Sequence, residues 1–157
     1  MPPKPRFLCD NMLGSLARWL RFLGYDTLYP EATGDTVILK LARDEDRILL
    51  TRDKELAARA AGRGRLVASD ILDEQLADVR RAFDLDLSGE KLLSRCSLCN
   101  AVLSAIDRSS AEKAGVPPQI VQRHDRFWRC PGCGQLYWPG SHYERIMGKI
   151  GKLDNGT

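Results

Sequence analysis

The chain has 157 residues, of which 43% are hydrophobic and 29% are charged. This composition suits a globular protein rather than a disordered one, and the length allows one ordinary domain or a small domain with an accessory module. No apolar run approaches the roughly 20 residues of a membrane-spanning helix, and the proline-rich start lacks the apolar segment of a signal peptide. We therefore expect a cytoplasmic protein with no membrane partner.

The net charge of +3 is unevenly distributed along the chain. Residues 1–90 contain 14 basic and 16 acidic residues, whereas residues 91–157 contain 10 basic and 5 acidic residues. A near-neutral first part with a basic second part suits an acidic site beside a module that attracts polyanions, although an ordinary solvated surface has the same charge pattern.

The first part of the chain alternates short apolar runs with amphipathic segments. The runs predict buried strands, and the segments between them predict helices, because apolar residues such as Leu13, Leu16, Ala17 and Leu20 recur at helical spacing. The predicted strands are Phe7–Asp10, Asp26–Tyr29, Arg47–Asp53 and Arg65–Ala68, and the helices begin near Leu13, Asp35, Lys54 and Ser69 or Asp70. This alternation predicts an α/β fold, a parallel sheet flanked by helices.

The apolar periodicity of the sequence weakens after the stretch from Asp84 to Leu93, and paired cysteines follow. We therefore place a domain boundary there. The expected domains are residues 1–90 and residues 91–157. In the second domain, 127–129 and 135–138 read as two short strands around a tight turn. A capping-box pattern at Ser141 starts a short basic helix through Met147, and we expect a loose tail from Gly148 onward.

Two Cys-x-x-Cys pairs dominate the second domain, with 30 residues between them: Cys96, Cys99, Cys130 and Cys133. Four thiolates satisfy tetrahedral Zn²⁺ in a closed, structural site. Asn100 and Gly134, which follow the two pairs, are the residue types that best tolerate the positive φ of a metal-binding knuckle.

Other interpretations of the cysteines are less compatible with this pattern. Disulfides are rare in a cytosolic protein, and redox chemistry does not explain two matching pairs, but a rubredoxin-like iron site would use the same ligands. His124 and His142 are alternative ligands that four thiolates make unnecessary. His142 could instead contact a substrate phosphate or simply begin a helix, and Cys9 reads as a core residue.

Carboxylates follow the predicted strands. Asp10 and Asp53 lie at the carboxyl ends of strands, where ligands of open α/β sheets bind, and Asp35 begins the helix between them. A cluster of such acids can hold Mg²⁺ or Mn²⁺ and support attack by water on a phosphodiester. Asp35 and Asp53 also precede helices and could be simple N-caps. Asp70 and Glu45 are the candidates for a fourth acid.

The order of these motifs resembles the C-terminal ribonuclease domain of the mutator-seven exonuclease family over about residues 6–147. The resemblance rests on residues 7–14, 16–21 and 23–27, on Asp35, on 47–53, on both cysteine pairs and on 138–143. It implies a PIN-like nuclease domain followed by a zinc ribbon. It also implies that Asp10, Asp35 and Asp53 bind metal and that Arg18, Arg21 and Arg52 contact phosphate.

The sequence therefore predicts a metal-dependent ribonuclease with a structural zinc ribbon that aids RNA binding. Two alternatives stay open. In the first, the sheet has lost its chemistry and the protein is an RNA-binding adaptor. In the second, the same acids serve a phosphatase or a nucleotide hydrolase.

Overall fold

A four-stranded parallel sheet forms the first part of the protein, in a computed structural model that describes residues 3–30, 33–88 and 92–155. The side chains of residues 141–142 and 154–155 and the predicted boundary between residues 90 and 91 lie outside this description. The strand order is β2-β1-β3-β4. The strands are β1 (Phe7–Cys9), β2 (Thr27–Leu28), β3 (Ile48–Thr51) and β4 (Gly64–Leu66). The predicted strands and their parallel arrangement are confirmed.

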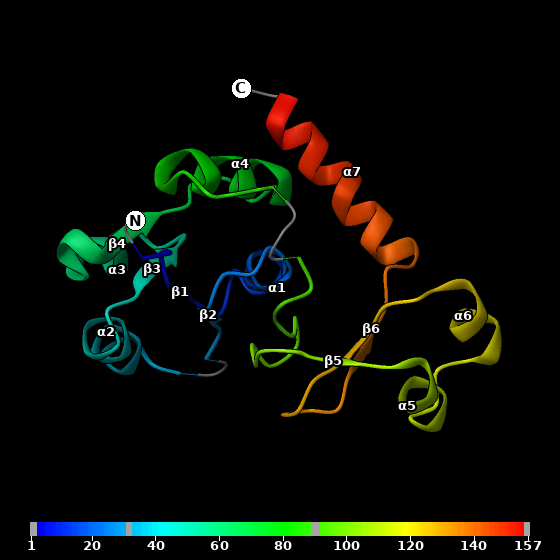
Figure 1. Cartoon of the computed structure of the whole chain (residues 1–157). Helices are drawn as coiled ribbons and strands as arrows, with labels where there is room; N and C mark the ends of the chain where they lie inside the picture. Colours follow the sequence, from blue (N-terminus) through cyan, green and yellow to red (C-terminus); the bar gives the residue numbers. More distant parts are fainter. Residues whose placement is uncertain (1–2, 31–32, 89–91, 156–157) are drawn as a thin grey trace.

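Helices cover both faces of this sheet (Figure 1). They are α1 (Gly14–Phe22), α2 (Asp35–Asp44), α3 (Lys54–Arg59) with the 3-10 turn η1 (Ala61–Arg63), and α4 (Leu72–Phe83). Because side chains alternate along a strand, Phe7 and Cys9 face α1 and α4, while Leu8 faces α2 and α3. A strand buried on both faces needs a continuous apolar run, which is why β1 and β3 were recognisable in the sequence.

The second part of the protein is a three-stranded antiparallel sheet with two short helices, and only two of its strands were predicted. The sheet order is β5-β6-β7. Its elements are β5 (Ser104–Ile106), α5 (Arg108–Lys113), α6 (Pro118–Arg123), β6 (Phe127–Arg129) and β7 (Leu136–Tyr137). Ala111, Val116 and Phe127 form a small core between α5, α6 and the sheet. With so few buried residues, this segment has little of the periodicity that reveals a helix in a sequence.

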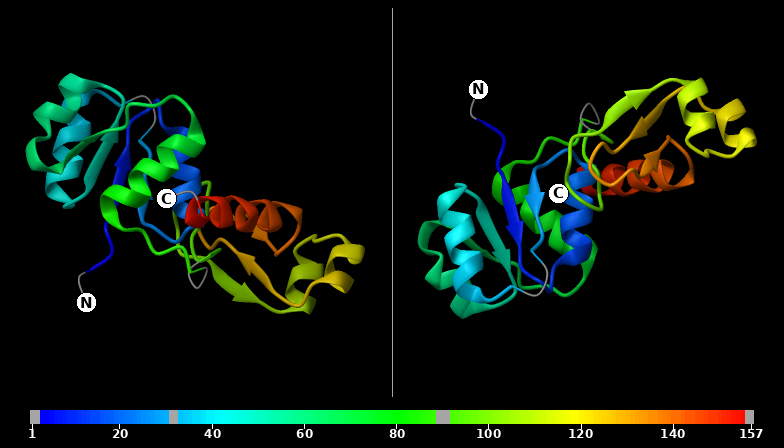
Figure 2. Two further views of the ribbon diagram at one scale, coloured as in Figure 1. Left: turned by 90° about the horizontal axis from the view of Figure 1, so that it is seen from above. Right: turned by 90° about the horizontal axis from the view of Figure 1, so that it is seen from below.

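The last helix, α7 (Ser141–Asn155), corrects the prediction of a short helix with a loose tail after Met147. Ile146 and Ile150 are buried in the core formed by α1 and α4. Lys149 also lies over the ring of Trp19, with its Nζ atom 5.0 Å from the ring centroid. Helix α7 thus returns to the first part of the chain, where it lies beside α1 (Figure 2). Tertiary packing thus stabilises α7 although it contains Gly148 and Gly151, whose intrinsic helix propensity is low.

The predicted N-cap of α4 at Ser69 or Asp70 is wrong. The residue before the helix is Ile71, with no side-chain cap. The Ser69 hydroxyl instead accepts a hydrogen bond from the Ile71 N–H at 3.0 Å, while Asp70 is exposed.

No helix among the described residues has the length and apolar character required to span a membrane.

The packing of α7 predicts that Ile146→Ala lowers the free energy of unfolding by about 2–5 kcal/mol, because it opens a cavity in the shared core. The matched control is Met147→Ala, since the neighbouring Met147 is 41% exposed, and a change below about 0.5 kcal/mol is expected there. Denaturant unfolding followed by circular dichroism measures both values. Equal effects of the two substitutions would contradict the packing of α7.

Candidate metal centre and acidic edge

The two cysteine pairs form two knuckles of the same geometry. In the first knuckle, the Cys96 N–H donates to the Ala101 carbonyl at 2.8 Å and the Asn100 N–H donates to the Cys96 carbonyl at 2.9 Å. In the second, the corresponding bonds from Cys130 and Gly134 are both 2.9 Å long. Asn100 has φ +73° and Gly134 has φ +82°. The predicted positive φ at both positions is confirmed.

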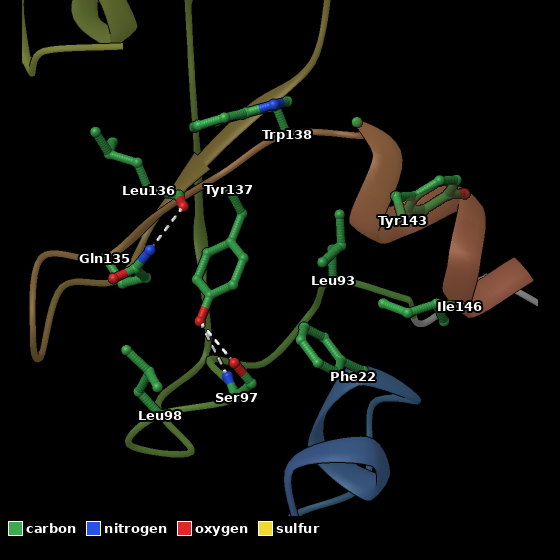
Figure 3. A pocket seen from close by; sticks show the side chains of 11 residues that line it. Phe22, Leu93, Ser97, Leu98, Gln135, Leu136, Tyr137, Trp138, Tyr143 and Ile146 are labelled. Carbon is green, nitrogen blue, oxygen red and sulfur yellow. Dashed lines mark hydrogen bonds between the residues drawn. The ribbon is translucent and has the colours of Figure 1, made fainter.

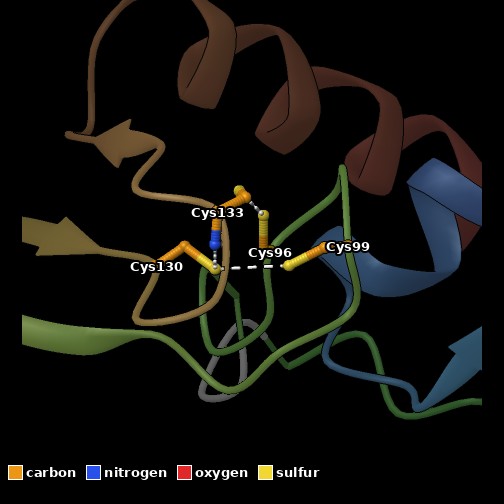
Figure 4. A group of neighbouring side chains, drawn as sticks. All are labelled: Cys96, Cys99, Cys130 and Cys133. Carbon is orange, nitrogen blue, oxygen red and sulfur yellow. Dashed lines mark hydrogen bonds between the residues drawn. The ribbon is translucent and has the colours of Figure 1, made fainter.

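The four thiols converge on one point (Figure 4). All four Sγ atoms lie within 4.8 Å of one another. The Cys96–Cys133 and Cys99–Cys130 pairs are separated by 3.6 and 3.3 Å. A tetrahedral ion with Zn–S bonds of about 2.3 Å requires sulfurs roughly 3.8 Å apart, so this donor set fits zinc. The four cysteines can therefore bind zinc in a closed site.

The knuckle amides tune the thiols that such an ion would meet. The Ala101 amide lowers the pKa of Cys99, but burial and the neighbouring thiols raise it to about 12. At Cys130, burial raises the pKa, whereas the amide of Cys133 and the thiol of Cys99 bring it down to about 7. Since thiolates are the metal ligands, binding of the ion would release the proton that this raised pKa keeps on Cys99.

Asn100 joins the first knuckle to the parallel sheet. Its side-chain carbonyl accepts a hydrogen bond from the Thr27 N–H at 3.0 Å, and its amide donates to the Asp26 carboxylate at 2.7 Å. Arg47, which is buried before β3, donates to the same carboxylate at 2.8 Å. Asn100 therefore has two functions, as the positive-φ residue of the knuckle and as the link to β2.

Arg21 makes a second link between the two parts. Its guanidinium is buried and donates to the Thr27 carbonyl at 2.8 Å and to the Ser97 carbonyl at 2.9 Å. Burial lowers the pKa of Arg21, and two backbone carbonyls accept hydrogen bonds from its guanidinium. Arg18, one turn earlier on α1, is exposed. Of these two predicted phosphate contacts, only Arg18 has its side chain in solvent.

A threonine connects the two acids that follow β1 and β3. The Thr51 hydroxyl donates to the buried carboxylate of Asp10 and accepts the N–H of Asp53 at 3.0 Å. The Met12 N–H also donates to Asp10 at 3.1 Å. Asp10 and Asp53 therefore lie at the same edge of the sheet, as predicted, with Thr51 between them. Sequence reasoning missed this link through Thr51, because a threonine in an apolar run reads as part of a strand.

Asp53 is a helix cap, as the alternative interpretation held. It accepts the N–H groups of Glu55 and Leu56 at 2.9 and 3.1 Å, both on Oδ1. No hydrogen bond to Oδ2 is present among the described residues. Because a carboxylate oxygen has more than one lone pair and the second oxygen is spared, the cap does not exclude a metal ligand.

The other acids lie further from this arrangement. Asp35 is exposed and its carboxylate pairs with Arg59 at 3.7 Å. Glu45 precedes β3 and contacts Arg47 at the opposite edge of the sheet, so it is not a fourth acid beside Asp10. Within the described ranges, the cysteines are the one set of potential ligands whose atoms all lie within 4.8 Å of one another, and Asp10, Asp35 and Asp53 are not gathered in this way.

Arg52 and His142 complete the predicted site residues. Arg52 follows β3, next to Asp53, and its Nε atom is buried with no hydrogen-bond partner in the described part of the chain. Since buried donors are seldom left without a partner, this guanidinium has spare capacity for an acceptor. His142 lies in the first turn of α7, and its side chain is outside the described residues.

The fold and site define an α/β protein with a parallel sheet, an acidic carboxyl edge and a four-cysteine centre that can bind zinc. The chain belongs to the Mut7-C RNAse domain family, whose model matches residues 5–150. This membership supports a nuclease-type function. No solved structure matches the chain.

A human protein named exonuclease mut-7 homolog is 34% identical over 101 residues. The match includes 60% of this chain but only 12% of the human protein. The chain thus spans a small part of the length of this relative.

The role of Asn100 predicts that Asn100→Gly lowers the free energy of unfolding by about 1–3 kcal/mol, because the buried Thr27 N–H loses its acceptor. The knuckle itself should survive, since glycine occupies the equivalent position in the other one. The control is Gly134→Asn, where an added Cβ has no neighbour within 4 Å. Metal analysis and denaturant unfolding measure both effects. Loss of zinc in Asn100→Gly would contradict this separation of roles.

Asp26 predicts a pH dependence of stability. Burial raises its pKa, but hydrogen bonds from Arg47 and Asn100 lower it to about 2 from the usual 3.8. A lowered pKa stabilises the fold above about pH 4, and the contribution of about 2 kcal/mol is lost as the pH falls from 4 to 2. The stability difference between the wild-type protein and Asp26→Asn should therefore shrink over this window.

Paired denaturant titrations at each pH test this prediction. A stability difference that stays constant from pH 5 to pH 2 would contradict the assignment.

Proposed function

We propose that the protein is a divalent-metal-dependent ribonuclease with a PIN-like parallel sheet and a structural zinc ribbon. Asp10, Asp35 and Asp53 would hold Mg²⁺ or Mn²⁺, which prefer carboxylate oxygens. When bound, such an ion activates a water molecule and stabilises the charge that develops on a phosphodiester. The observation that carries this proposal is the Thr51 hydroxyl, which bonds to the Asp10 carboxylate and to the backbone N–H of Asp53 at the edge where α/β proteins bind ligands.

Other side chains would orient the acids and bind the phosphate groups of the substrate. Thr51 orients the Asp10 carboxylate, while the amides of α3 hold Oδ1 of Asp53 and leave Oδ2 for a ligand. Arg52 lies beside Asp53, its buried Nε has no hydrogen-bond partner among the described residues, and its guanidinium would bind a phosphate oxygen there. Arg18 supplies an exposed positive charge on α1, and His142 at the start of α7 is a further candidate contact.

Arg21 has a different part in this proposal. Its two hydrogen bonds to backbone carbonyls position the ribbon against α1, so its charge would act on phosphate at longer range. The basic second part of the chain would add electrostatic attraction for RNA. Human exonuclease mut-7 homolog is named as an exonuclease. That name agrees with hydrolysis of phosphodiesters in nucleic acid.

The proposal predicts that Asp53→Asn keeps the fold but lowers RNA cleavage by at least about 100-fold, because one charged oxygen ligand is lost. Asparagine caps helices as well as aspartate, so α3 should stay intact. The measurement is cleavage of labelled RNA with Mg²⁺ or Mn²⁺, with circular dichroism as the folding check.

Asp44→Asn is the matched control. Asp44 is an exposed acid at the end of α2, where it pairs with Lys40, and its loss should leave cleavage unchanged. Cleavage by Asp53→Asn at the rate of the control would refute the assignment of the acidic edge.

A second function, a non-catalytic RNA-binding adaptor, is favoured by one observation. The Asp35 carboxylate pairs with Arg59, and among the described residues the three acids are not gathered into a metal-binding group. RNA binding that weakens with salt, without cleavage in any divalent ion, would support the adaptor over the nuclease.

A further inference from the structure

We call the part of the chain with the four cysteines and the β5-β6-β7 sheet the ribbon. An aromatic pocket lies where the ribbon meets α1 and α7 (Figure 3). We call it the junction pocket. Its volume is about 340 Å³, within the range of small-molecule sites. The lining residues that matter here are Phe22, Leu98, Gln135, Tyr137, Trp138 and Tyr143. They come from elements far apart in the sequence, so no single segment could have revealed the pocket.

Two features hold the pocket walls in place. The Tyr137 hydroxyl accepts the Ser97 N–H at 3.1 Å and lies 3.2 Å from the Sγ of Cys96, which ties the ring to the metal-binding knuckle. A Cβ atom at Gly140 would lie 2.8 Å from Nε1 of Trp138, so glycine permits this ring to lie against the backbone. The rings of Tyr137 and Trp138 are thus positioned before any ligand enters.

A second, cationic pocket of about 270 Å³ adjoins the junction pocket. We call it the arginine pocket. It is lined by Gly14, Ser15, Arg18, Arg21, Tyr29 and Leu98. Leu98, which is 52% exposed, lines both pockets. The hydrogen bond from Arg21 to the Ser97 carbonyl also crosses between them, because Ser97 lines the junction pocket.

The arginine pocket extends toward the acidic edge. Gly14 and Ser15 begin α1, only a few residues after Asp10, and Tyr29 follows the carboxyl end of β2. The Tyr29 hydroxyl donates to the Asn11 carbonyl at 2.8 Å, beside Asp10 in the chain. The acidic edge, the arginine pocket and the junction pocket are therefore consecutive neighbours.

We propose that the two pockets form a subsite for one unpaired nucleotide of an RNA strand. Its base stacks on the aromatic side chains of the junction pocket, and its phosphate lies in the arginine pocket near Arg18. Aromatic rings stack with any base, and Gln135 offers a polar group at the rim. This inference rests on the proposed function and deepens it, since it specifies single-stranded RNA as the substrate.

Base pairing explains why this subsite would exclude double-stranded RNA. A base within a helix is stacked on both faces and paired at its edge, so it cannot enter a pocket between two modules. A loop, a bulge or a strand end presents a free base. The charge complementarity of Arg18 and Arg21 with phosphate favours a nucleotide over an apolar peptide as the occupant.

The test measures binding of a labelled eight-nucleotide oligouridylate and of an RNA duplex by fluorescence anisotropy, without added Mg²⁺ or Mn²⁺. Trp138→Ala should weaken single-strand binding about tenfold, because one stacked base is worth roughly 1–3 kcal/mol. Trp138→Phe should keep affinity within about threefold, since a ring remains. Duplex affinity should change in neither variant.

Further variants separate stacking, charge and folding. Tyr143→Leu keeps apolar volume and should also weaken single-strand binding, which guards against a folding defect in Trp138→Ala. Arg18→Ala should reduce the slope of log affinity against log salt by about one contact. Arg43→Ala is the matched control, because its exposed side chain on α2 lies on the other face of the sheet, and it should leave binding unchanged.

Single-strand binding that is unaffected by both aromatic substitutions would overturn the subsite, as would an equal loss for duplex RNA. These outcomes are independent of catalysis. If the wild-type protein binds RNA through these residues but does not cleave it, the ribonuclease proposal fails and the subsite stands.

Discussion

The packing of the two parts of the protein against each other depends on the hydrogen bonds of the Asn100 side chain. Its side-chain carbonyl accepts the N–H of Thr27 on the edge strand β2, and its amide donates to the charged carboxylate of Asp26. Its own backbone adopts the positive φ of the knuckle. A metal bound at the four cysteines would therefore order the surface that meets the sheet. Asn100 therefore places the first knuckle against the parallel sheet.

Three further contacts reinforce that placement. Arg21 reaches from α1 to Ser97, and Ile146 and Ile150 of α7 enter the core under α1. The chain thus leaves the parallel sheet, forms the four-cysteine centre and returns to the same core. Because the junction pocket lies between these contacts, its shape follows from the docking of the ribbon rather than from either part alone.

Hydrogen bonds orient two carboxylates at the acidic edge. Asp53 caps α3 through Oδ1, and Asp10 is held by Thr51. These bonds engage both carboxylate oxygens of Asp10 and leave Oδ2 of Asp53 without a hydrogen bond among the described residues. The Mut7-C RNAse domain family supports a nuclease-type function for the chain, and the orientation of these two acids is the structural feature that a nuclease proposal can build on.

The sequence alone determined the α/β alternation, the parallel sheet and the two knuckles, because buried strands need continuous apolar runs and metal ligands need fixed spacing. It also placed Asp10 and Asp53 at one edge. It missed β5, α5 and α6, since their small core leaves little periodicity.

Tertiary structure decided what depends on contacts between distant residues. It extended α7 to Asn155 by burying Ile150, and it set Arg21 inside the protein instead of on its surface. It also made Asn100 a bridge between the two parts. Local sequence patterns carry backbone preferences and ligand spacing, whereas the partner of a side chain is known only once the chain has folded.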